Sequence, residues 1–265
     1  MKLNLVLPLL LLSLICTGQQ KKIKTVTTTQ TIVFAAVDRP GDFYIVLEDG
    51  TIEKYSKDGE KLAQRTNSSK PTIFDPRDGA RLFAYFQKDH RYQYLNPELE
   101  LVHELILDSA FAISPLLICP AGDRELWILD TADYSLKRTV LMGTSLKQES
   151  EIKTIIPEHK PSYTYMREYQ NFLFLLDHNY GLLIFNMMGK HIKSIALPGL
   201  PYFNFLGEEL YYPDHGKIKF LDLISGEIRD QQFQVSGEYI LLTDERLFSI
   251  HQNTFEVFEY HHNLH

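Results

Sequence analysis

The chain has 265 residues, of which 44% are hydrophobic, 12% aromatic and 23% charged, as in ordinary globular proteins. This composition excludes a disordered, collagen-like or coiled-coil chain. Its 27 basic and 34 acidic side chains give a net charge of −7, so no basic field favours nucleic acid or an anionic membrane surface as a partner.

Residues 1–18 have the pattern of a secretory signal peptide. Lys2 supplies the positive start, an apolar run extends from Leu5 to Cys16, and small residues follow. The run is too short to span a bilayer comfortably as a helix. We therefore expect residues 1–18 to be removed. The mature chain, residues 19–265, is then exported to the periplasm, the cell envelope or the medium, without a transmembrane span.

The two cysteines have different expected fates. Lipid attachment at Cys16 is an alternative to simple cleavage, but Ile15 is bulkier than the small residue usually found before a lipidated cysteine. Cys119 lies in the apolar stretch 116–119, with no candidate base nearby in the sequence. We expect Cys119 to be a small residue of the core and not a nucleophile.

The first hairpin follows the signal segment. Residues 42–47 form an apolar run, residues 48–50 read Glu-Asp-Gly, and residues 51–55 form a second run with a polar face. Another turn, Lys-Asp-Gly, occupies residues 57–59. Two runs of strand length joined by a glycine turn are typical of a β-hairpin.

This hairpin pattern returns five more times along the chain. The first strands of the six copies begin at residues 43, 82, 126, 172, 210 and 247, so the repeat is close to forty residues. A repeat of this length with several strands per unit is typical of a β-propeller blade. Helical repeats would show apolar stripes with a 3.6-residue period, and the chain instead has short β-branched and aromatic runs.

Strands from the two ends of the chain are expected to belong to the same blade. An apolar segment precedes each hairpin and a fourth strand follows most of them, but the sixth copy has no fourth strand because the chain ends soon after Tyr260. A spare strand, residues 22–29, precedes the first copy. Placing it as the outer strand of the last blade closes the ring. The sequence thus predicts one all-β domain over residues 19–265, a six-bladed β-propeller with four antiparallel strands per blade.

Three segments have an aspartate where a strand ends and a polar turn begins. They are Leu129-Asp130-Thr131, Leu176-Asp177-His178-Asn179 and Tyr212-Pro213-Asp214-His215-Gly216. In these segments and in its strand spacing, the chain resembles the six-bladed propellers of the NHL-repeat and TolB-like kind, which are bacterial exported propellers. The resemblance covers residues 22–260 as architecture and implies the fold, without an activity. The signatures of WD40, kelch and sialidase propellers are absent from the sequence.

The dipeptide Asp-His recurs at the end of the first strand of three hairpins. The three copies are Asp89-His90, Asp177-His178 and Asp214-His215. In a ring these turns would lie on one face, where carboxylates and imidazoles could form a divalent-metal or acid–base site. The structural alternative, which we favour, is that each aspartate accepts hydrogen bonds from the backbone of its own turn.

A second candidate site is aromatic. Tyr163 and Tyr165 keep the two-residue spacing of one strand face, as do Phe203 and Phe205. On innermost strands, such a set would face the central channel and could stack on a sugar, a peptide or a cofactor. Packing between blades is the favoured alternative, because blade faces need large apolar side chains.

No nucleotide-binding, metalloprotease, serine-hydrolase or EF-hand motif occurs in the sequence. We therefore predict no catalytic residue and no cofactor, with a divalent metal at the Asp-His turns left open. The expected function is an exported non-catalytic binding or scaffold protein that presents one face of the ring to a protein or cell-envelope component. The alternatives are a metal-dependent hydrolase or lactonase with a site at the channel mouth, and a binder of a small molecule or cofactor in the channel.

Overall fold

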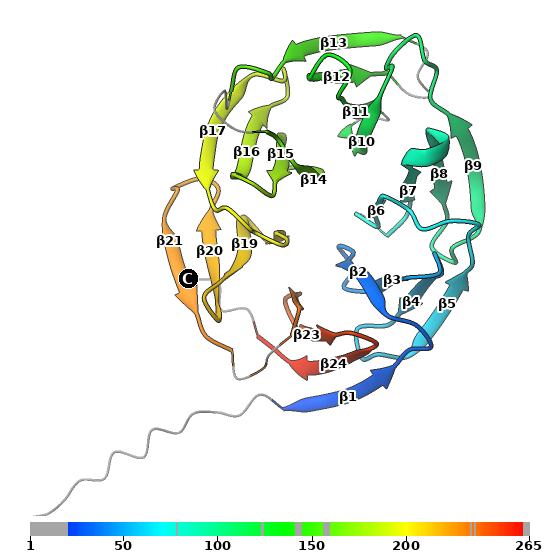
Figure 1. The fold of residues 1–265 in the computed structure, drawn as a ribbon. Coiled ribbons are helices and arrows are strands. Elements are labelled where there is room, and N and C mark those ends of the chain that lie inside the picture. Colours follow the sequence, from blue (N-terminus) through cyan, green and yellow to red (C-terminus); the bar gives the residue numbers. More distant parts are fainter. Residues whose placement is uncertain are drawn as a thin grey trace, which may run out of the picture.

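The computed structural model describes residues 21–77, 79–122, 125–140, 145–155, 160–233, 235 and 237–261. Six sheets of four antiparallel strands stand around a common axis and form a closed ring (Figure 1). The blades also contain a short 3-10 turn, η1 (Gln87–Asp89). Among the described residues there is no helix with the length and apolar character needed to cross a membrane. The expected signal peptide, with Cys16, lies outside the described residues.

Each of the first five blades uses four consecutive strands, numbered from the channel outward. Blade 1 contains β2 (Ile32–Val37), β3 (Phe43–Leu47), β4 (Ile52–Tyr55) and β5 (Lys61–Arg65). Blade 2 contains β6 (Ile73–Asp75), β7 (Leu82–Phe86), β8 (Arg91–Leu95) and β9 (Leu101–Ile106). Blade 3 contains β10 (Pro115–Ala121), β11 (Glu125–Asp130), β12 (Ser135–Thr139) and β13 (Leu146–Glu151).

The remaining blades continue around the ring. Blade 4 contains β14 (Tyr163–Tyr169), β15 (Phe172–Asp177), β16 (Gly181–Asn186) and β17 (His191–Ala196). Blade 5 contains β18 (Asn204–Leu206), β19 (Glu209–Asp214), β20 (Lys217–Asp222) and β21 (Ile228–Gln231). Blade 6 contains β22 (Tyr239–Leu242), β23 (Arg246–His251), β24 (Thr254–Glu259) and the N-terminal β1 (Lys22–Thr27).

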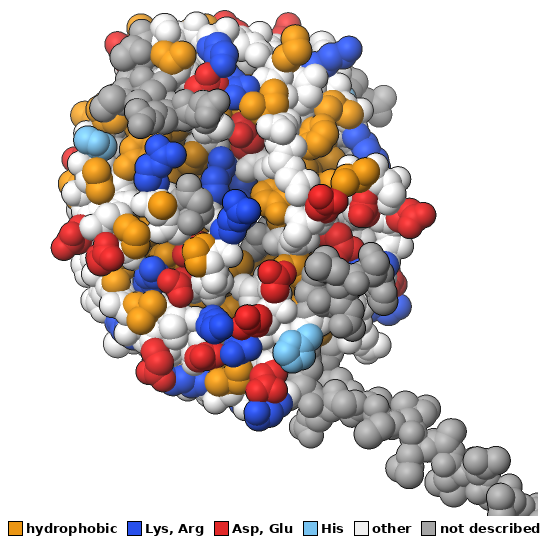
Figure 2. Space-filling model, turned by 180° about the vertical axis from the view of Figure 1, so that it is seen from behind, with side chains coloured by type: hydrophobic (Ala, Val, Ile, Leu, Met, Phe, Trp, Pro, Cys, Tyr) orange, Lys and Arg blue, Asp and Glu red, His pale blue; other side chains and the backbone are white. Residues whose placement is uncertain are grey.

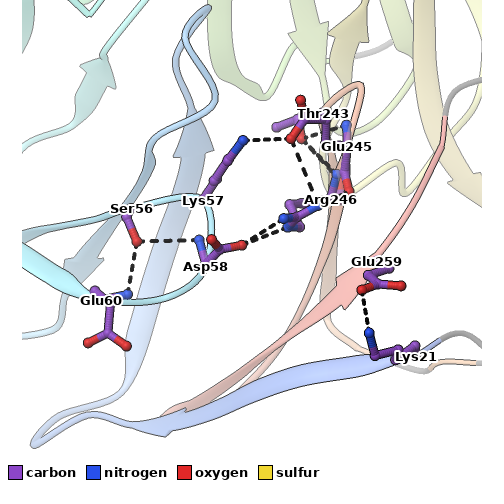
Figure 3. A network of polar contacts seen from close by, with 9 residues as sticks. All are labelled: Lys21, Ser56, Lys57, Asp58, Glu60, Thr243, Glu245, Arg246 and Glu259. Carbon is purple, nitrogen blue, oxygen red and sulfur yellow. Dashed lines mark hydrogen bonds and ion pairs between the residues drawn. The ribbon is translucent and has the colours of Figure 1, made fainter.

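The fold predicted from the sequence is confirmed. The second strands of the blades begin at residues 43, 82, 125, 172, 209 and 246, within one residue of the six predicted positions. The spare N-terminal strand is the outer strand of blade 6 and pairs antiparallel with β24, with Val26 opposite Phe255. An ion pair of 2.7 Å between Lys21 and Glu259 lies beside this pairing (Figure 3).

Residue type follows the position of each strand in its blade. All five residues of β3 and of β7 are buried, because the middle of a blade is covered by a neighbouring blade on each side. The outer strand β5 alternates between exposed and half-buried residues. The apolar clusters lie between adjacent blades, as where Phe43 of blade 1 stacks on Phe248 of blade 6 with ring centroids 4.5 Å apart. The core is therefore divided among the blade interfaces.

The turn of the first hairpin requires its glycine. Gly50 has a φ of +86°, a left-handed conformation that side chains disfavour. A Cβ at this position would also lie 2.7 Å from the carbonyl carbon of Ser69, in the segment that leads to blade 2. The glycine thus allows the β3–β4 turn to pack closely against the connection between two blades.

The seam between the first and last blades also carries a polar network. Lys57 pairs with Glu245 at 2.6 Å, and Asp58 pairs with Arg246 at 2.8 Å (Figure 3). These contacts join the β4–β5 turn of blade 1 to the β22–β23 turn of blade 6. Because the four side chains remain partly exposed, we assign most of the seam's stability to strand pairing and apolar packing.

The two ends of the ring axis present different turns. Antiparallel strands alternate in direction, so the turns between second and third strands lie at the same end as the connections between blades. The hydrogen bond of 2.8 Å from His178 N to Ser162 O joins two such segments. We call this end the mouth face. The opposite end, the far face, carries the turns between first and second strands and between third and fourth strands.

Candidate functional site

A cavity of about 550 Å³ occupies the channel at the mouth face. Its walls come from five blades: β2, the segment that leads into β6, the β7–β8 turn, β14, the segment that leads into β18, and β22. Pockets of this size and concave shape are typical of small-molecule sites. The cavity exists only because the ring brings together segments that are far apart in the sequence.

Arg167 of β14 provides the charged floor of this cavity. Its side chain is 7% exposed, and it donates a hydrogen bond of 2.8 Å to Asn204 Oδ1 on β18. Its guanidinium lies 3.8 Å from the Asp75 carboxylate and 5.6 Å from the centroid of the Phe205 ring. Burial is the largest effect and opposes the charge, but the Asp75 carboxylate together with Tyr165, Tyr169 and Tyr211 outweighs it, so the pKa of Arg167 is raised. Arg167 is therefore held as a fixed cation.

Asp75 is shared between two guanidiniums. It is almost fully buried, with Arg77 Nη2 at 3.3 Å from one oxygen and Arg167 Nη2 at 3.8 Å from the other. Burial would raise the pKa of Asp75, but Arg77 and Arg167 outweigh it and hold this pKa below its ordinary value. One carboxylate thus faces two cations in the channel.

The residue after Arg167 points toward blade 3. Glu168 accepts hydrogen bonds from Trp127 Nε1 at 2.7 Å and from Gly122 N at 2.8 Å. Arg77 donates to the backbone oxygen of Glu168 at 3.0 Å. The network therefore ties blades 2, 3 and 4 together around the channel. Seen from behind the view of Figure 1, several Lys and Arg side chains gather toward the centre of the ring (Figure 2).

Sequence reasoning missed Asp75, Arg167 and Glu168. The available signal was the charged pair Arg167-Glu168 inside an otherwise largely aromatic segment that becomes an innermost strand. No repeat points to these residues, because their partners lie in other blades.

The three Asp-His turns lie between second and third strands, and therefore all on the mouth face. Asp177 is fully buried at the end of β15 and accepts hydrogen bonds of 3.0 Å from Ser162 N and Asn179 N. Asp130, at the same position in blade 3, accepts from Ile113 N at 2.9 Å and Ala132 N at 3.0 Å. In these two blades the aspartate binds the backbone of its own turn and of the segment leading into its blade.

The other two aspartates have different surroundings. Asp214 pairs with His215 Nδ1 at 2.5 Å and with Lys219 Nζ at 3.1 Å, and the Lys219 hydrogen bond is the main reason that the pKa of Asp214 is lowered. The His215 side chain is 96% exposed. Asp89 is exposed at the end of η1, and His90 closes that turn in a left-handed conformation with a φ of +47°.

The structure does not bring the Asp-His pairs together. In the part of the chain that the structure describes, no three side chains of His, Cys, Asp or Glu are grouped so that they could hold a metal ion. The three turns share a face but belong to blades 2, 4 and 5, and each lies between the two middle strands of its blade. The blade 2 turn borders the cavity through Gln87 and Lys88.

A register shift separates the two candidate tyrosines. Tyr163 pairs with Asp177 and Tyr165 with Leu176, so Thr164 forms a bulge and the two-residue spacing no longer places both rings on one face. Tyr165 lines the cavity and contacts Phe34 and Phe203, with ring centroids 5.9 Å and 5.4 Å away. Burial raises the pKa of Tyr165 to about 12. Tyr163 packs on the apolar cluster of blades 2 to 4, where burial also raises its pKa.

Cys119 is fully buried in β10. Burial raises the pKa of its thiol well above the ordinary value, so the nucleophilic thiolate is disfavoured. The expectation of a buried core cysteine is confirmed.

Comparisons with known proteins support the fold. No protein-family model matches the chain, and no curated protein matches it in sequence. Among solved structures, BamB from Moraxella catarrhalis is similar at 8% identity and a TM-score of 0.50, covering 91% of this chain and 100% of that chain. The Neurospora crassa Pan2 WD40 domain is similar at 7% identity and a TM-score of 0.57, covering 92% of this chain and 96% of that one.

A third similar structure is larger. The extracellular domain of a putative one-component system from B. thetaiotaomicron, BT4673, has 11% identity and a TM-score of 0.52, with 86% of this chain covered and 33% of that chain. Likenesses at such low identity show the propeller architecture and do not single out the NHL-repeat or TolB-like kind.

Proposed function

We propose that this chain is an exported, non-catalytic propeller that binds a protein or cell-envelope partner through its mouth face. The pattern of residues 1–18 supports export. A rigid ring whose loops carry the recognition surface is a common scaffold for binding, which supports the non-catalytic role. The propeller folds of the similar solved structures are consistent with it.

The observation that carries the proposal is a pair of exposed apolar side chains on the mouth face. Ile106 at the end of β9 and Ile113 in the β9–β10 connection are each 74% exposed. Leu107 N donates a hydrogen bond of 2.8 Å to His90 O, so this connection lies against the β7–β8 turn. The same turn contributes Lys88 to the cavity wall. Large apolar side chains that are exposed on one face are candidates for a contact surface.

No catalytic step enters the proposal, and the contacts of two of the three candidate aspartates support this. Asp177 is bound by backbone N–H groups, and Asp214 is bound by Lys219 and His215. These contacts fit aspartates that shape turns.

Site-specific crosslinking in the native host tests the proposal. The photoreactive residue p-benzoylphenylalanine is placed at Ile113 or, as a matched control on the far face, at Met188 in the β16–β17 turn, which is 71% exposed. We expect an ultraviolet-induced adduct of defined mass in the envelope or exported fraction from position 113, and none from position 188. The adduct should weaken when Ile106 is changed to Ser.

Two results would overturn the proposal. Equal adducts from both positions, or adducts from position 188 alone, would show that the mouth face is not the contact surface. Recovery of the full chain in the cytoplasmic fraction alone would refute export.

A further inference from the structure

The cavity at the mouth face has a one-sided charge. Its charged lining side chains, among the described residues, are Lys70, Lys88 and Arg167, and no carboxylate lines it. This is the opposite of the whole chain, in which acidic residues exceed basic ones by seven. Cations of one sign in a concave site concentrate anionic ligands there.

The three cations lie at two different depths in the cavity. Arg167 is buried at the floor and held by Asn204. Because Arg77 shares the Asp75 carboxylate with Arg167, that carboxylate does not neutralise Arg167 alone. Lys88 and Lys70 are exposed at the rim.

The rim cation Lys70 is available to a ligand. It pairs with Glu48 at 2.9 Å, and both side chains are largely exposed, which makes this pair weak and exchangeable. An acid group entering the mouth therefore meets two exposed ammonium groups first and a fixed guanidinium below them.

Much of the remaining wall is aromatic and apolar, and its polar side chains are Ser69, Thr72, Gln87, Thr164 and Asn204. Phe34 of β2, Tyr165 of β14 and Tyr239 of β22 are half-buried rings from three different blades that line the cavity. Tyr165 packs edge-on against Phe203, and Tyr239 lies 5.0 Å from the Tyr202 ring between centroids. Rings held in place by such neighbours provide firm surfaces for an apolar or aromatic body.

From these features we infer that the cavity is a binding site for a small organic anion, with a carboxylate or sulfonate group on an aromatic or apolar body. The acid group pairs with the cations, and the body packs on the half-buried rings. This site is separate from the partner contact proposed above, because it requires only the ring itself.

Equilibrium dialysis of the purified full-length protein with 2-naphthalenesulfonate, and with the neutral 2-naphthamide as comparison, tests the inference. We expect the sulfonate to bind at least about tenfold more tightly than the amide, because only the sulfonate pairs with the cations. Equal affinity for the two compounds, or no binding of the sulfonate at millimolar concentration, would overturn it.

Matched double variants locate the charges. The K70Q/K88Q variant removes two exposed lysines from the rim, of which Lys70 pairs with Glu48. The K57Q/K190Q control removes the same charge from far-face turns, where Lys57 pairs with Glu245. We expect the rim variant to bind 2-naphthalenesulfonate about fivefold to tenfold more weakly and the control to keep the wild-type affinity. Equal losses in both variants would mean non-specific attraction and would contradict the inference.

Chemical protection shows where the probe binds. Thr164 is exposed and lines the cavity, and Cys119 is fully buried. In a Thr164→Cys variant, alkylation at residue 164 is measured by peptide mass spectrometry. Saturating 2-naphthalenesulfonate should slow this alkylation severalfold. Binding without protection would place the probe elsewhere and refute the site, whereas the crosslinking result for the partner surface would be unaffected.

Discussion

At the scale of single residues, the channel is organised by buried charges. Asp75 lies between Arg77 and Arg167, and its pKa is lowered because these cations outweigh the cost of burial. Glu168 connects the next position of β14 to Trp127 of blade 3. Removing one partner of such a group leaves an uncompensated buried charge, which is strongly destabilising.

The Asp75→Asn variant tests this arrangement through pH. A folded-state pKa below the unfolded value means that ionised Asp75 stabilises the protein above about pH 4. This contribution is lost as the pH falls through the folded-state pKa. At pH 7 we expect the variant to lose about 3 to 5 kcal/mol of unfolding free energy, because Arg77 and Arg167 lose their carboxylate.

Denaturant unfolding measured between pH 7 and pH 3 checks the sign. The difference between wild type and Asp75→Asn should begin to shrink as the pH falls below about 4, because Asp75 of the unfolded chain then takes up a proton, and it should be lost only as the pH passes the lower folded-state pKa. Conversion of Asp75 to Asn with no loss of stability at pH 7 would contradict the assigned role. A Glu60→Gln variant, which changes an exposed carboxylate paired with Lys24, serves as the control.

At this scale the sequence predicted where the candidate residues lie better than it predicted what surrounds their side chains. It placed the three Asp-His pairs at corresponding turns, because the hairpin repeat fixes where second strands end. It did not identify Asp75 or Arg167. The residue preferences of a strand do not show whether a side chain faces solvent or a charged group of another blade. It also treated Tyr163 and Tyr165 as one face, and the bulge at Thr164 that separates them leaves no clear mark in the sequence.

At the scale of elements, the N-terminal strand is the part that closes the ring. β1 pairs along β24, and Val26 packs on the apolar cluster between blades 6 and 1. Without β1, the outer edge of β24 would present unpaired N–H and C=O groups to solvent or to another chain. The sequence predicted this closure, because the sixth repeat lacks a strand and the first has one to spare.

Deletion of residues 22–27 tests the role of β1. Loss of several strand hydrogen bonds and of the Val26 contact should lower the Tm by about 6 °C or more. The exposed β24 edge should also promote self-association, seen as a shift to larger species in size-exclusion chromatography.

A matched point variant separates strand pairing from charge. Lys21→Ala removes the exposed ion pair with Glu259 beside the same strand and should change the unfolding free energy by less than about 1 kcal/mol. A monomeric deletion variant with the wild-type Tm would show that β1 is dispensable for the ring.

At the scale of the whole molecule, the closed ring brings segments that are far apart in the sequence to one site. Five blades contribute to the cavity at the mouth face, and the polar network of Asp75, Arg77 and Glu168 crosses three blades. The three Asp-His turns, by contrast, stay apart in their own blades. A metal-dependent hydrolase at the channel mouth would require these groups to converge.

Metal removal distinguishes this alternative in solution. We expect excess EDTA to change the Tm of the wild-type protein by less than about 1 °C, since a metal bound to the folded state would add stability by mass action. The His178→Ala/His215→Ala variant should behave identically with and without EDTA. A fall in Tm with EDTA for the wild type, and none for the variant, would establish a metal at the Asp-His turns.

Repeat spacing and residue pattern were sufficient to predict the all-β ring, the number of blades, the start of each second strand and the closure by the N-terminal strand. These features are local or periodic, so they appear directly in the order of the residues. The cavity, its cations and its half-buried rings come instead from positions in five blades that meet only around a common axis. Their proximity depends on how the blades pack and on a one-residue bulge in β14, and such long-range geometry has no local signature in the chain.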